Sequence, residues 1–576
     1  MSNAKLTSFV EQWRLYLVLF VMLLCVLAIG WKVGTLHIVE RDFLQSQGDA
    51  RTIRTVPLVA NRGLISDRNG EPLAVSSPVT SIWVNPQEIG AQHSETVRLA
   101  TELGLDSDTL LASIQKNSRR EFLYVKRRLA PAEAVRILAL DIDGVYGQQE
   151  YQRFYPQGEV AAHLVGFSNV DDIGQEGLEL SYDEWLKGVP GRRQVIKDRR
   201  GHIIEELDTI QTAQPGKNLE LSIDFRLQNL AYKELKEEFV ARRAKSASIV
   251  VLDVDTGEVL AMANQPSYNP HNRKNLKDFS ILRNRAITDV FEPGSPIKAF
   301  TVAAALESGL YTPQTVIETS PGWMMVNGNE VKDIINYGAL DLTRVITKSS
   351  NIGATKIAFE IGPDAIRDVL ERVGMGQLSG TGFPSEQGGV LPNHRNWSRI
   401  ETATFSFGYG LSTTALQLAQ AYSVIADDGI RKPVSLLKLD EASLQALPRE
   451  QVIDKTINNQ VLAMLETVVD PARGGSARDA RVPFYKVAGK TGTVHVVSEY
   501  GGYEENLHNS LFVGLVPASD PKLVIVVIVY EPKGDEHYGS QVAAPVFSRV
   551  ASGAMRILNI APDDLPEDAS RELSSL

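Results

Sequence analysis

The chain has 576 residues and a net charge of −11, and 43% of its residues are hydrophobic while 22% are charged. This composition is typical of a folded protein, and the length predicts more than one domain. The sequence contains no long run of lysine and arginine, so we expect no nucleic acid partner. One cysteine and nine scattered histidines indicate neither a disulfide framework nor a metal site, and we expect no cofactor.

The N-terminal region predicts a membrane anchor. Residues 15–31 are apolar and uncharged, which reaches the lower length limit for a bilayer-spanning helix, and the apolar character resumes up to residue 38. A cleaved signal peptide is the alternative, with a possible site at Ala28-Ile29-Gly30, but the run exceeds the usual apolar region of such peptides. Lys5 and Arg14 favour a cytoplasmic segment 1–14, with the chain beyond the anchor outside the cytoplasmic membrane.

The remainder of the chain divides into two predicted domains. Turn-rich and strand-like stretches alternate over residues 39–215, and Gln214-Pro215-Gly216 then breaks the pattern. We expect a structural stalk over residues 39–215 and a second domain over residues 216–561. The acidic tail at 562–576 is predicted to be disordered.

The second domain begins and ends with strand signals. An amphipathic helix is predicted over residues 224–243, and the runs 248–254 and 258–263 predict a hairpin. Residues 510–516 and 523–530, split by the turn Pro517-Ala518-Ser519-Asp520-Pro521, predict a second hairpin near the C-terminus. Because alanine-rich helices lie between these strands, we expect an α+β fold in which the two ends of the domain join in one sheet.

A candidate nucleophile opens one of these helices. Residues 292–298 read Glu-Pro-Gly-Ser-Pro-Ile-Lys, which places Ser295 at a helix N-terminus. Lys298 lies three residues later on the same helix face, within reach of the Ser295 hydroxyl. Lysine can act as a base only if its pKa is lowered, and burial and a second cation both lower it. Lys490 is the candidate for that second cation.

The spacing Ser-x-x-Lys occurs by chance in a chain of this length, and it also begins at Ser2, Ser113, Ser435 and Ser519. Ser295 is distinguished by two later segments, Ser349-Ser350-Asn351 and then Lys490-Thr491-Gly492-Thr493. Taken singly, these segments could be a helix cap and an edge strand. In this order they form the signature of acyl-serine enzymes that bind penicillins.

Together with these motifs, further segments make the chain resemble the class B penicillin-binding proteins, and more narrowly their septal, division-specific branch. The resemblance covers nearly the whole chain. In the second domain the matching segments are Arg283-Asn284-Arg285-Ala286 and Phe407-Gly408-Tyr409-Gly410; in the stalk they are Arg62-Gly63, Asp67-Arg68, Gly70, Leu73-Ala74, Ala162-His163, Gly166 and Gly177-Leu178-Glu179. We interpret the stalk segments as residues of the fold and of interfaces.

The resemblance implies an architecture and an activity. The architecture is a single transmembrane helix, an elongated mixed α/β pedestal of the dimerisation type, and a serine β-lactamase-like transpeptidase domain with an antiparallel sheet flanked by helices. The activity is that of a peptidoglycan D,D-transpeptidase at the septum, with β-lactams as covalent inhibitors. Implied partners are the inner membrane, stem peptides, a septal glycan polymerase and division proteins.

The resemblance also implies a role for each site residue. Ser295 would be acylated, Lys298 would be the general base, Ser349 would relay a proton, Asn351 would hold a substrate amide, and Lys490 would tune the local charge. The backbone N–H groups of Ser295 and Thr493 would form the oxyanion hole, with Thr491, Gly492 and Thr493 forming the substrate-binding strand.

Three alternatives remain open at this point. The middle motif is Ser-Ser-Asn rather than the Ser-Asp-Asn of class A β-lactamases, and no segment obviously supplies their deacylating glutamate, which disfavours a hydrolase. A penicillin-sensing receptor or silent scaffold would need further membrane spans or a cytoplasmic domain. A bifunctional glycan polymerase would need a second catalytic domain before residue 215, where no acid cluster is evident.

Overall fold

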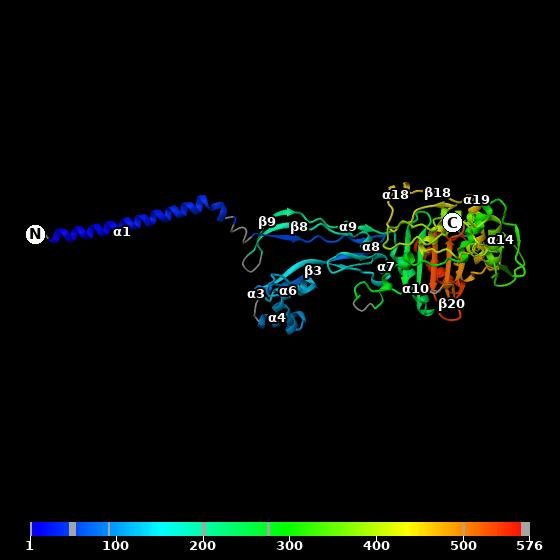
Figure 1. Cartoon of the computed structure of the whole chain (residues 1–576), viewed down its shortest axis with the longest axis horizontal. Coiled ribbons are helices and arrows are strands. Elements are labelled where there is room, and N and C mark those ends of the chain that lie inside the picture. The colour runs from blue at the N-terminus through cyan, green and yellow to red at the C-terminus, as the bar shows by residue number, and fades with distance from the viewer. Residues whose placement is uncertain are drawn as a thin grey trace, which may run out of the picture. The chain divides into compact units, whose positions relative to one another are not determined.

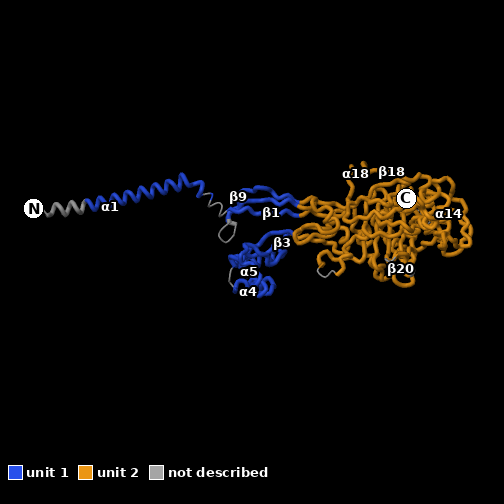
Figure 2. The backbone as a smooth tube through the Cα atoms, in the orientation of Figure 1, with its two compact units in different colours: residues 1–61, 78–151, 188–215 blue, residues 62–77, 152–187, 216–576 orange. Residues whose placement is uncertain are grey.

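The computed structural model describes residues 3–44, 46, 53–89, 93–197, 203–273, 277–498 and 501–565. The chain forms two compact units (Figure 2). Unit 1 comprises Met1–Asn61, Pro78–Tyr151 and Gly188–Pro215, and unit 2 comprises Arg62–Ser77, Gln152–Lys187 and Gly216–Leu576. The domain limits expected from the sequence stay predictions, and most of the expected tail (566–576) lies outside the described residues.

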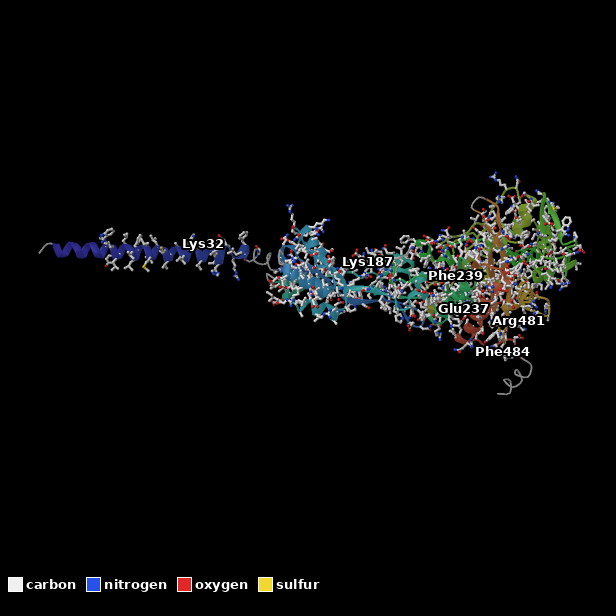
Figure 3. The ribbon with its side chains drawn as sticks, turned by 90° about the horizontal axis from the view of Figure 1, so that it is seen from below. Lys32, Lys187, Glu237, Phe239, Arg481 and Phe484 are labelled. Carbon is white, nitrogen blue, oxygen red and sulfur yellow. The ribbon has the colours of Figure 1, made fainter. Side chains whose placement is uncertain are left out.

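The N-terminal helix α1 (Asn3–Gly34) continues into a π-helical turn, η1 (Thr35–Val39). Within Trp13–Val39, an 18-residue window has a mean hydropathy of 2.4, and none of that window is buried within the protein. From Trp13 onward, side chains project along this helix, with Lys32 near its end (Figure 3). The predicted single N-terminal apolar helix is confirmed, and its length and composition suit one membrane-spanning anchor.

Unit 1 contains a three-stranded antiparallel sheet in the order β1 (Ile53–Leu58), β8 (Gly191–Lys197) and β9 (Ile203–Gln211). It also contains a small separate core built from Ile82, Val84, Leu99, Ile114, Ile137 and their neighbours. The elements around that core are α3 (Pro86–Ile89), α4 (His93–Leu103), α5 (Ser107–Lys116), β4 (Leu123–Leu129) and α6 (Pro131–Leu138). Strands β3 (Pro72–Val84) and β5 (Val145–Phe154) each continue from one unit into the other.

The N-terminal parts of unit 2 consist of short elements. They are β2 (Ile65–Ser66), η2 (Gly158–Val160), α7 (Ala162–Val165), β6 (Phe167–Ser168), β7 (Gly174–Glu176), α8 (Gly177–Ser181), α9 (Asp183–Leu186) and β10 (Leu219–Glu220). Their apolar side chains belong to the same continuous core as the rest of unit 2.

The rest of unit 2 is organised around a five-stranded antiparallel sheet in the order β12-β11-β21-β20-β19. The strands are β11 (Ser246–Asp253), β12 (Val259–Gln265), β19 (Ala488–Val497), β20 (Tyr503–Val516) and β21 (Leu523–Tyr530). β11 pairs with β21 along its whole length, from Ser246 opposite Tyr530 to Asp253 opposite Leu523. The expected joining of the two ends of the domain in one sheet is confirmed.

Helices pack on this sheet (Figure 1). α10 (Phe225–Ala241) and α20 (Gly539–Ile557) contact each other and the sheet, while α17 (Ala415–Ala426) contacts β11 and β21, and α19 (Lys455–Val469) contacts β19. The expected amphipathic helix at 224–243 is α10, which Asp224 caps by accepting the N–H of Arg226.

The remaining helices of unit 2 are η3 (Phe279–Leu282), α11 (Arg285–Thr288), η4 (Ser295–Ile297), α12 (Lys298–Glu307), α13 (Leu342–Lys348), α14 (Asn351–Ile361), α15 (Pro363–Arg372), α16 (Arg399–Phe405), α18 (Glu441–Gln445) and η5 (Arg478–Ala480). The remaining strands are β13 (Val316–Glu318), β14 (Trp323–Val326), β15 (Asn329–Lys332), β16 (Ala339–Asp341), β17 (Ile430–Arg431) and β18 (Glu450–Gln451).

A buried ionic group connects segments of unit 2 that lie far apart in sequence. Glu179 accepts from Arg62 Nε and Arg153 Nε, both at 2.6 Å, and Arg62 Nη1 lies 2.7 Å from Asp183 Oδ1. The side chains of Arg62, Arg153 and Glu179 are at most 1% exposed. Glu179 therefore compensates two buried guanidinium groups, and removing its charge would leave them poorly paired.

Replacing this carboxylate tests its contribution to stability. We expect Glu179→Gln to lower the free energy of unfolding by about 3–5 kcal/mol, because a buried ion pair is broken from one side. The measurement is chemical denaturation of the full chain in detergent. Glu184→Gln, at an exposed position on the neighbouring helix, is the matched control and should change little. Equal effects of the two substitutions would contradict this role.

Candidate active site

Ser295 begins a short 3₁₀ turn, η4, that leads directly into α12. Gly294, just before it, has φ of 65°, a conformation that glycine adopts without strain. The Gly294 N–H donates to the Gly408 carbonyl at 3.0 Å, and a Cβ at Gly408 would lie 2.1 Å from the Gly294 carbonyl oxygen. Glycine is therefore required at position 408 so that the backbone there can approach the turn that carries Ser295.

Ser349 lies between α13 and α14 in a left-handed conformation, with φ of 57° and ψ of 41°. This conformation is uncommon for residues other than glycine and costs of order 1–3 kcal/mol, so its occurrence is typical of a functional position. Ser350 caps α14 by accepting the Gly353 N–H, and Asn351 is the first residue of that helix. The junction thus places Ser349 at the end of α13 and Asn351 at the start of α14.

The Lys-Thr-Gly-Thr segment lies on β19, the edge strand of the sheet. Side chains alternate along a strand, so Lys490 and Gly492 share one side and Thr491 and Thr493 the other. A Cβ at Gly492 would meet the Leu511 side chain at 2.7 Å and the Pro293 carbonyl oxygen at 3.1 Å. This close approach brings β19 against the turn that carries Ser295.

The three motifs meet at the hydroxyl of Ser349. Ser349 Oγ donates to Ser295 Oγ at 3.1 Å and accepts from Lys490 Nζ at 2.9 Å and from Lys298 Nζ at 3.2 Å. Lys298 Nζ also donates to the Ser349 carbonyl oxygen at 2.6 Å and to Asn351 Oδ1 at 2.7 Å. The hydroxyls, amines and amide that were predicted as site residues are thus brought together.

The sequence predicts direct contact between Lys298 and Ser295, and the geometry differs. Among the hydrogen bonds of the described residues, none joins Lys298 Nζ to Ser295 Oγ, and Ser349 Oγ lies between the two groups. The 3₁₀ turn aligns side chains three residues apart, but Lys298 extends to Ser349 and Asn351 instead. Catalytic hydrogen bonds often tighten only when substrate binds, so this arrangement is compatible with a base at Lys298.

Both lysine side chains are completely buried, at 0% exposure. Burial lowers the pKa of Lys298 well below its ordinary value, the charge of Lys490 lowers it further, and the Asp333 carboxylate opposes both effects. Burial also lowers the pKa of Lys490 to about 7. The site therefore favours a neutral amine at a pH where an exposed lysine is charged.

Asp333 is a site-supporting residue that the sequence patterns did not reveal. Its carboxylate accepts from Ser350 Oγ at 2.6 Å, from the Asn351 N–H at 2.5 Å and from the Ile352 N–H at 3.1 Å. It therefore fixes the start of α14 and the position of Asn351. Asp333 directly follows β15 and lies 18 residues before the start of α14, so no local pattern relates the two.

Thr491 and Thr493, predicted to lie on a substrate-binding strand, have different surroundings. Thr493 Oγ1 accepts the N–H of Gly539, the first residue of α20, at 3.0 Å. A Cβ at Gly539 would lie 2.4–2.5 Å from the carbonyl oxygens of Leu511 and Gly492, so α20 begins directly against β19 and β20. Thr491 and Thr493 are both partly exposed, which leaves their face of the strand accessible.

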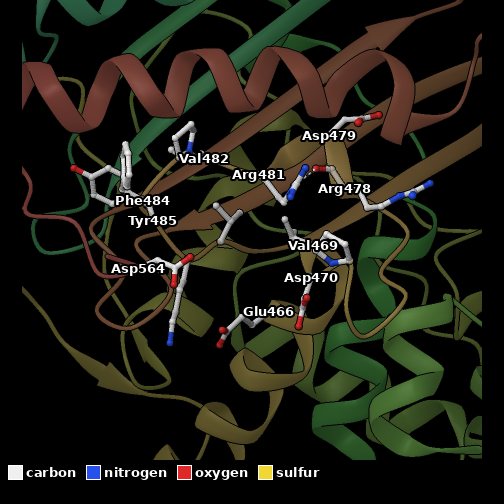
Figure 4. Close-up of a pocket in the computed structure, with 14 residues that line it drawn as sticks. Glu466, Val469, Asp470, Arg478, Asp479, Arg481, Val482, Phe484, Tyr485 and Asp564 are labelled. Atoms are coloured by element: carbon white, nitrogen blue, oxygen red, sulfur yellow. Dashed lines mark hydrogen bonds between the residues drawn. The ribbon is translucent and has the colours of Figure 1, made fainter. Parts of the chain in front are cut away.

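A cavity of about 790 Å³ lies elsewhere in unit 2 (Figure 4). It is lined by 14 residues from the segments 466–471, 478–487 and 564, among them Arg478, Arg481 and Phe484, and by none of the predicted site residues. Among the described residues, no group of three or more histidine, cysteine, aspartate or glutamate side chains could hold a metal ion. The candidate site is therefore defined by its side-chain geometry and not by this cavity.

Comparison with known proteins gives consistent matches. The penicillin binding protein transpeptidase domain matches residues 247–552, and the penicillin-binding protein dimerisation domain matches residues 57–221. The chain is 44% identical to the probable peptidoglycan D,D-transpeptidase PbpC of Pseudomonas aeruginosa, over 97% of each chain. It is 42% identical to the peptidoglycan D,D-transpeptidase FtsI of Escherichia coli, covering 96% of this chain and 93% of that protein.

A solved structure is also similar over most of the chain. Penicillin binding protein 3 of Mycobacterium tuberculosis, complexed with aztreonam, has a TM-score of 0.67 and 28% identity, covering 88% of this chain and 98% of that chain. Both domain matches agree with the observed fold and with the ordered motifs that meet at Ser349. The chain belongs to the class B penicillin-binding proteins, with a dimerisation domain followed by a penicillin-binding transpeptidase domain.

Proposed function

We propose that this protein is a peptidoglycan D,D-transpeptidase that cross-links stem peptides during septal cell-wall synthesis through an acyl-Ser295 intermediate. The observation that carries the proposal is the meeting of Ser295, Lys298 and Lys490 around the Ser349 hydroxyl. The names of the PbpC and FtsI relatives support the same activity. The same serine is the expected covalent target of β-lactams.

In the acylation step, Ser295 Oγ attacks the carbonyl carbon of the penultimate D-alanine. The Ser295 proton passes to neutral Lys298, either directly after a small movement or through Ser349, whose hydroxyl lies between them. Hydroxyl protons rotate freely, so Ser349 can reverse its present donor role. The C–N bond to the terminal D-alanine then breaks, and Ser349 delivers its proton to the leaving amine as it takes up the proton held by Lys298, which becomes neutral again.

In the transfer step, the neutral amine of a second stem peptide attacks the acyl carbon. A C–N bond forms as the C–Oγ bond breaks, and the proton lost by the amine returns to Ser295 Oγ through Lys298. The buried, low-pKa environment keeps Lys298 able to accept and then release this proton.

The remaining site residues hold the donor stem. The N–H groups of Ser295 and Thr493 would stabilise the oxyanion, where losing one donor typically costs about 2.7–4 kcal/mol of barrier. The hydroxyl groups of Thr491 and Thr493 would bind the terminal carboxylate, and Gly492 allows the strand to pass the nucleophile turn. Asn351, held by Lys298 and by the Lys332 carbonyl oxygen, would contact a substrate amide.

The proposed location is the inner membrane at the division site. The single apolar helix α1 would span the membrane once, with residues 1–14 in the cytoplasm and the catalytic unit on the outer, periplasmic side. A septal glycan polymerase and other division proteins are the proposed partners, through the anchor and the dimerisation domain.

Ser295→Ala should abolish covalent labelling of the full chain by a fluorescent penicillin, because it removes the hydroxyl that attacks the β-lactam carbonyl. Labelling is read by gel fluorescence after denaturation. Ser113→Ala is the matched control, since Ser113 begins the same Ser-x-x-Lys spacing outside the site. Persistent labelling of Ser295→Ala would refute the nucleophile assignment.

Lys298→Ala should slow acylation by about 10²- to 10⁴-fold, because general base catalysis typically contributes this much. The second-order rate constant of penicillin acylation is the quantity to measure. Lys233→Ala, which removes an exposed lysine from α10 in the same unit, should leave it unchanged. A near-normal rate in Lys298→Ala would assign the base to another group.

Between mildly acidic pH and the ordinary pKa of lysine, the acylation rate constant should rise and then level off before that pKa is reached. The rise follows the neutral fraction of Lys298, whose pKa is lowered by burial and by Lys490. With an unperturbed lysine as the base, the rate would continue to rise through its ordinary pKa of about 10.4. Stopped-flow acylation across this range, with the fold monitored by circular dichroism, distinguishes the two profiles.

A further inference from the structure

Glu292 lies three residues before Ser295 on the same turn and is not used by the mechanism above. Its Oε1 accepts from the Gly410 N–H at 2.7 Å and from the Tyr503 hydroxyl at 3.2 Å. Its Oε2 is buried and has no hydrogen-bond partner among the described residues. An unpaired buried carboxylate oxygen is costly, so a native site that retains one needs an explanation.

Two tyrosine side chains adjoin this carboxylate. The rings of Tyr409 and Tyr503 meet edge to face with centroids 5.4 Å apart, and Tyr503 is 48% exposed. Within the described ranges, no lysine, arginine or histidine forms an ion pair with Glu292. Burial raises the pKa of Glu292, whereas the bonds from Gly410 and Tyr503 lower it. A carboxylate beside aromatic rings, without a cation of its own, has the chemistry of a site for a cationic ligand.

The proposed reaction supplies a ligand of this kind. The acceptor stem enters as an ammonium group and must reach the acyl carbon on Ser295. Glu292 begins the turn that carries Ser295, and Gly410 closes the segment whose Gly408 packs against Gly294. The carboxylate is therefore fixed to the same backbone as the reacting centre.

We propose that Glu292, flanked by Tyr409 and Tyr503, binds the ammonium group of the acceptor stem peptide. This inference rests on the proposed function, because only a transpeptidase uses an amine as its second substrate. Binding requires the half-exposed Tyr503 hydroxyl to leave Oε1, so that the ammonium group can take its place. The exchange replaces a hydrogen bond from a neutral hydroxyl by a charge-assisted one, which is roughly twice as strong. The bound ammonium then releases one proton to water and attacks as the neutral amine.

The partition of the acyl-enzyme between water and an amine tests this role. The full chain in detergent is acylated by a thioester analogue of the D-alanyl-D-alanine donor, with D-alanine amide as the cationic acceptor and methanol as a neutral acceptor. Chromatography gives the ratios of aminolysis and of methanolysis to hydrolysis. We expect Glu292→Gln to lower the aminolysis ratio about tenfold, because a charge-assisted contact is lost, with the methanolysis ratio as the internal reference.

Glu504→Gln is the matched control, because it removes an exposed carboxylate next to Tyr503. An unchanged aminolysis ratio in Glu292→Gln would overturn the proposal. Slower acylation with an unchanged ratio would also overturn it, since the carboxylate would then serve the donor stem. A chain that is not acylated at all would instead reject the proposed function.

A second measurement needs no substitution at Glu292. Tetramethylammonium carries a positive charge but has no lone pair with which to attack the acyl group. In the unmodified chain it should reduce aminolysis by D-alanine amide while leaving methanolysis unaffected. Equal effects on both acceptors, or no effect on either, would exclude a cation site that serves the acceptor.

Discussion

The burial of two lysine side chains around one serine hydroxyl is the constraint on which the catalytic unit depends. Neither Lys298 nor Lys490 is exposed, and both reach Ser349 Oγ. Burying ammonium groups is unfavourable unless they are hydrogen-bonded or neutral, so the site needs a rigid surrounding core. The five-stranded sheet and the buried α12 provide that core, and the same burial lowers the pKa of both lysines.

Sequence patterns predicted the elements and the motifs better than the contacts between them. Helix α10, both hairpins and the joining of the domain ends in one sheet follow from periodicity and turn residues, which are local. The ordered motifs identified the residues that meet at Ser349. The placement of Ser349 between Lys298 and Ser295 was not predictable, because it depends on the left-handed backbone at the α13–α14 junction.

Supporting residues were the hardest to recognise from the sequence. Asp333 directly follows the β14–β15 hairpin and accepts hydrogen bonds from the start of α14. The hydrogen-bond partners of Glu292 come from two other segments of the chain. The same applies to Arg62, Arg153 and Glu179, whose pairing no motif in the sequence indicated. Buried charge pairs between distant segments leave no periodic signal, since each residue alone resembles an ordinary surface charge.

The pairing of β11 with β21 has a consequence for biosynthesis. About 270 residues separate the end of β11 from the start of β21. At roughly 5–20 residues per second, the ribosome needs some tens of seconds to supply the partner strand. During that interval one edge of a strongly apolar hairpin lacks its neighbour, which makes it prone to aggregation. The hairpin therefore gains its neighbour only after the last strands of unit 2 have been made.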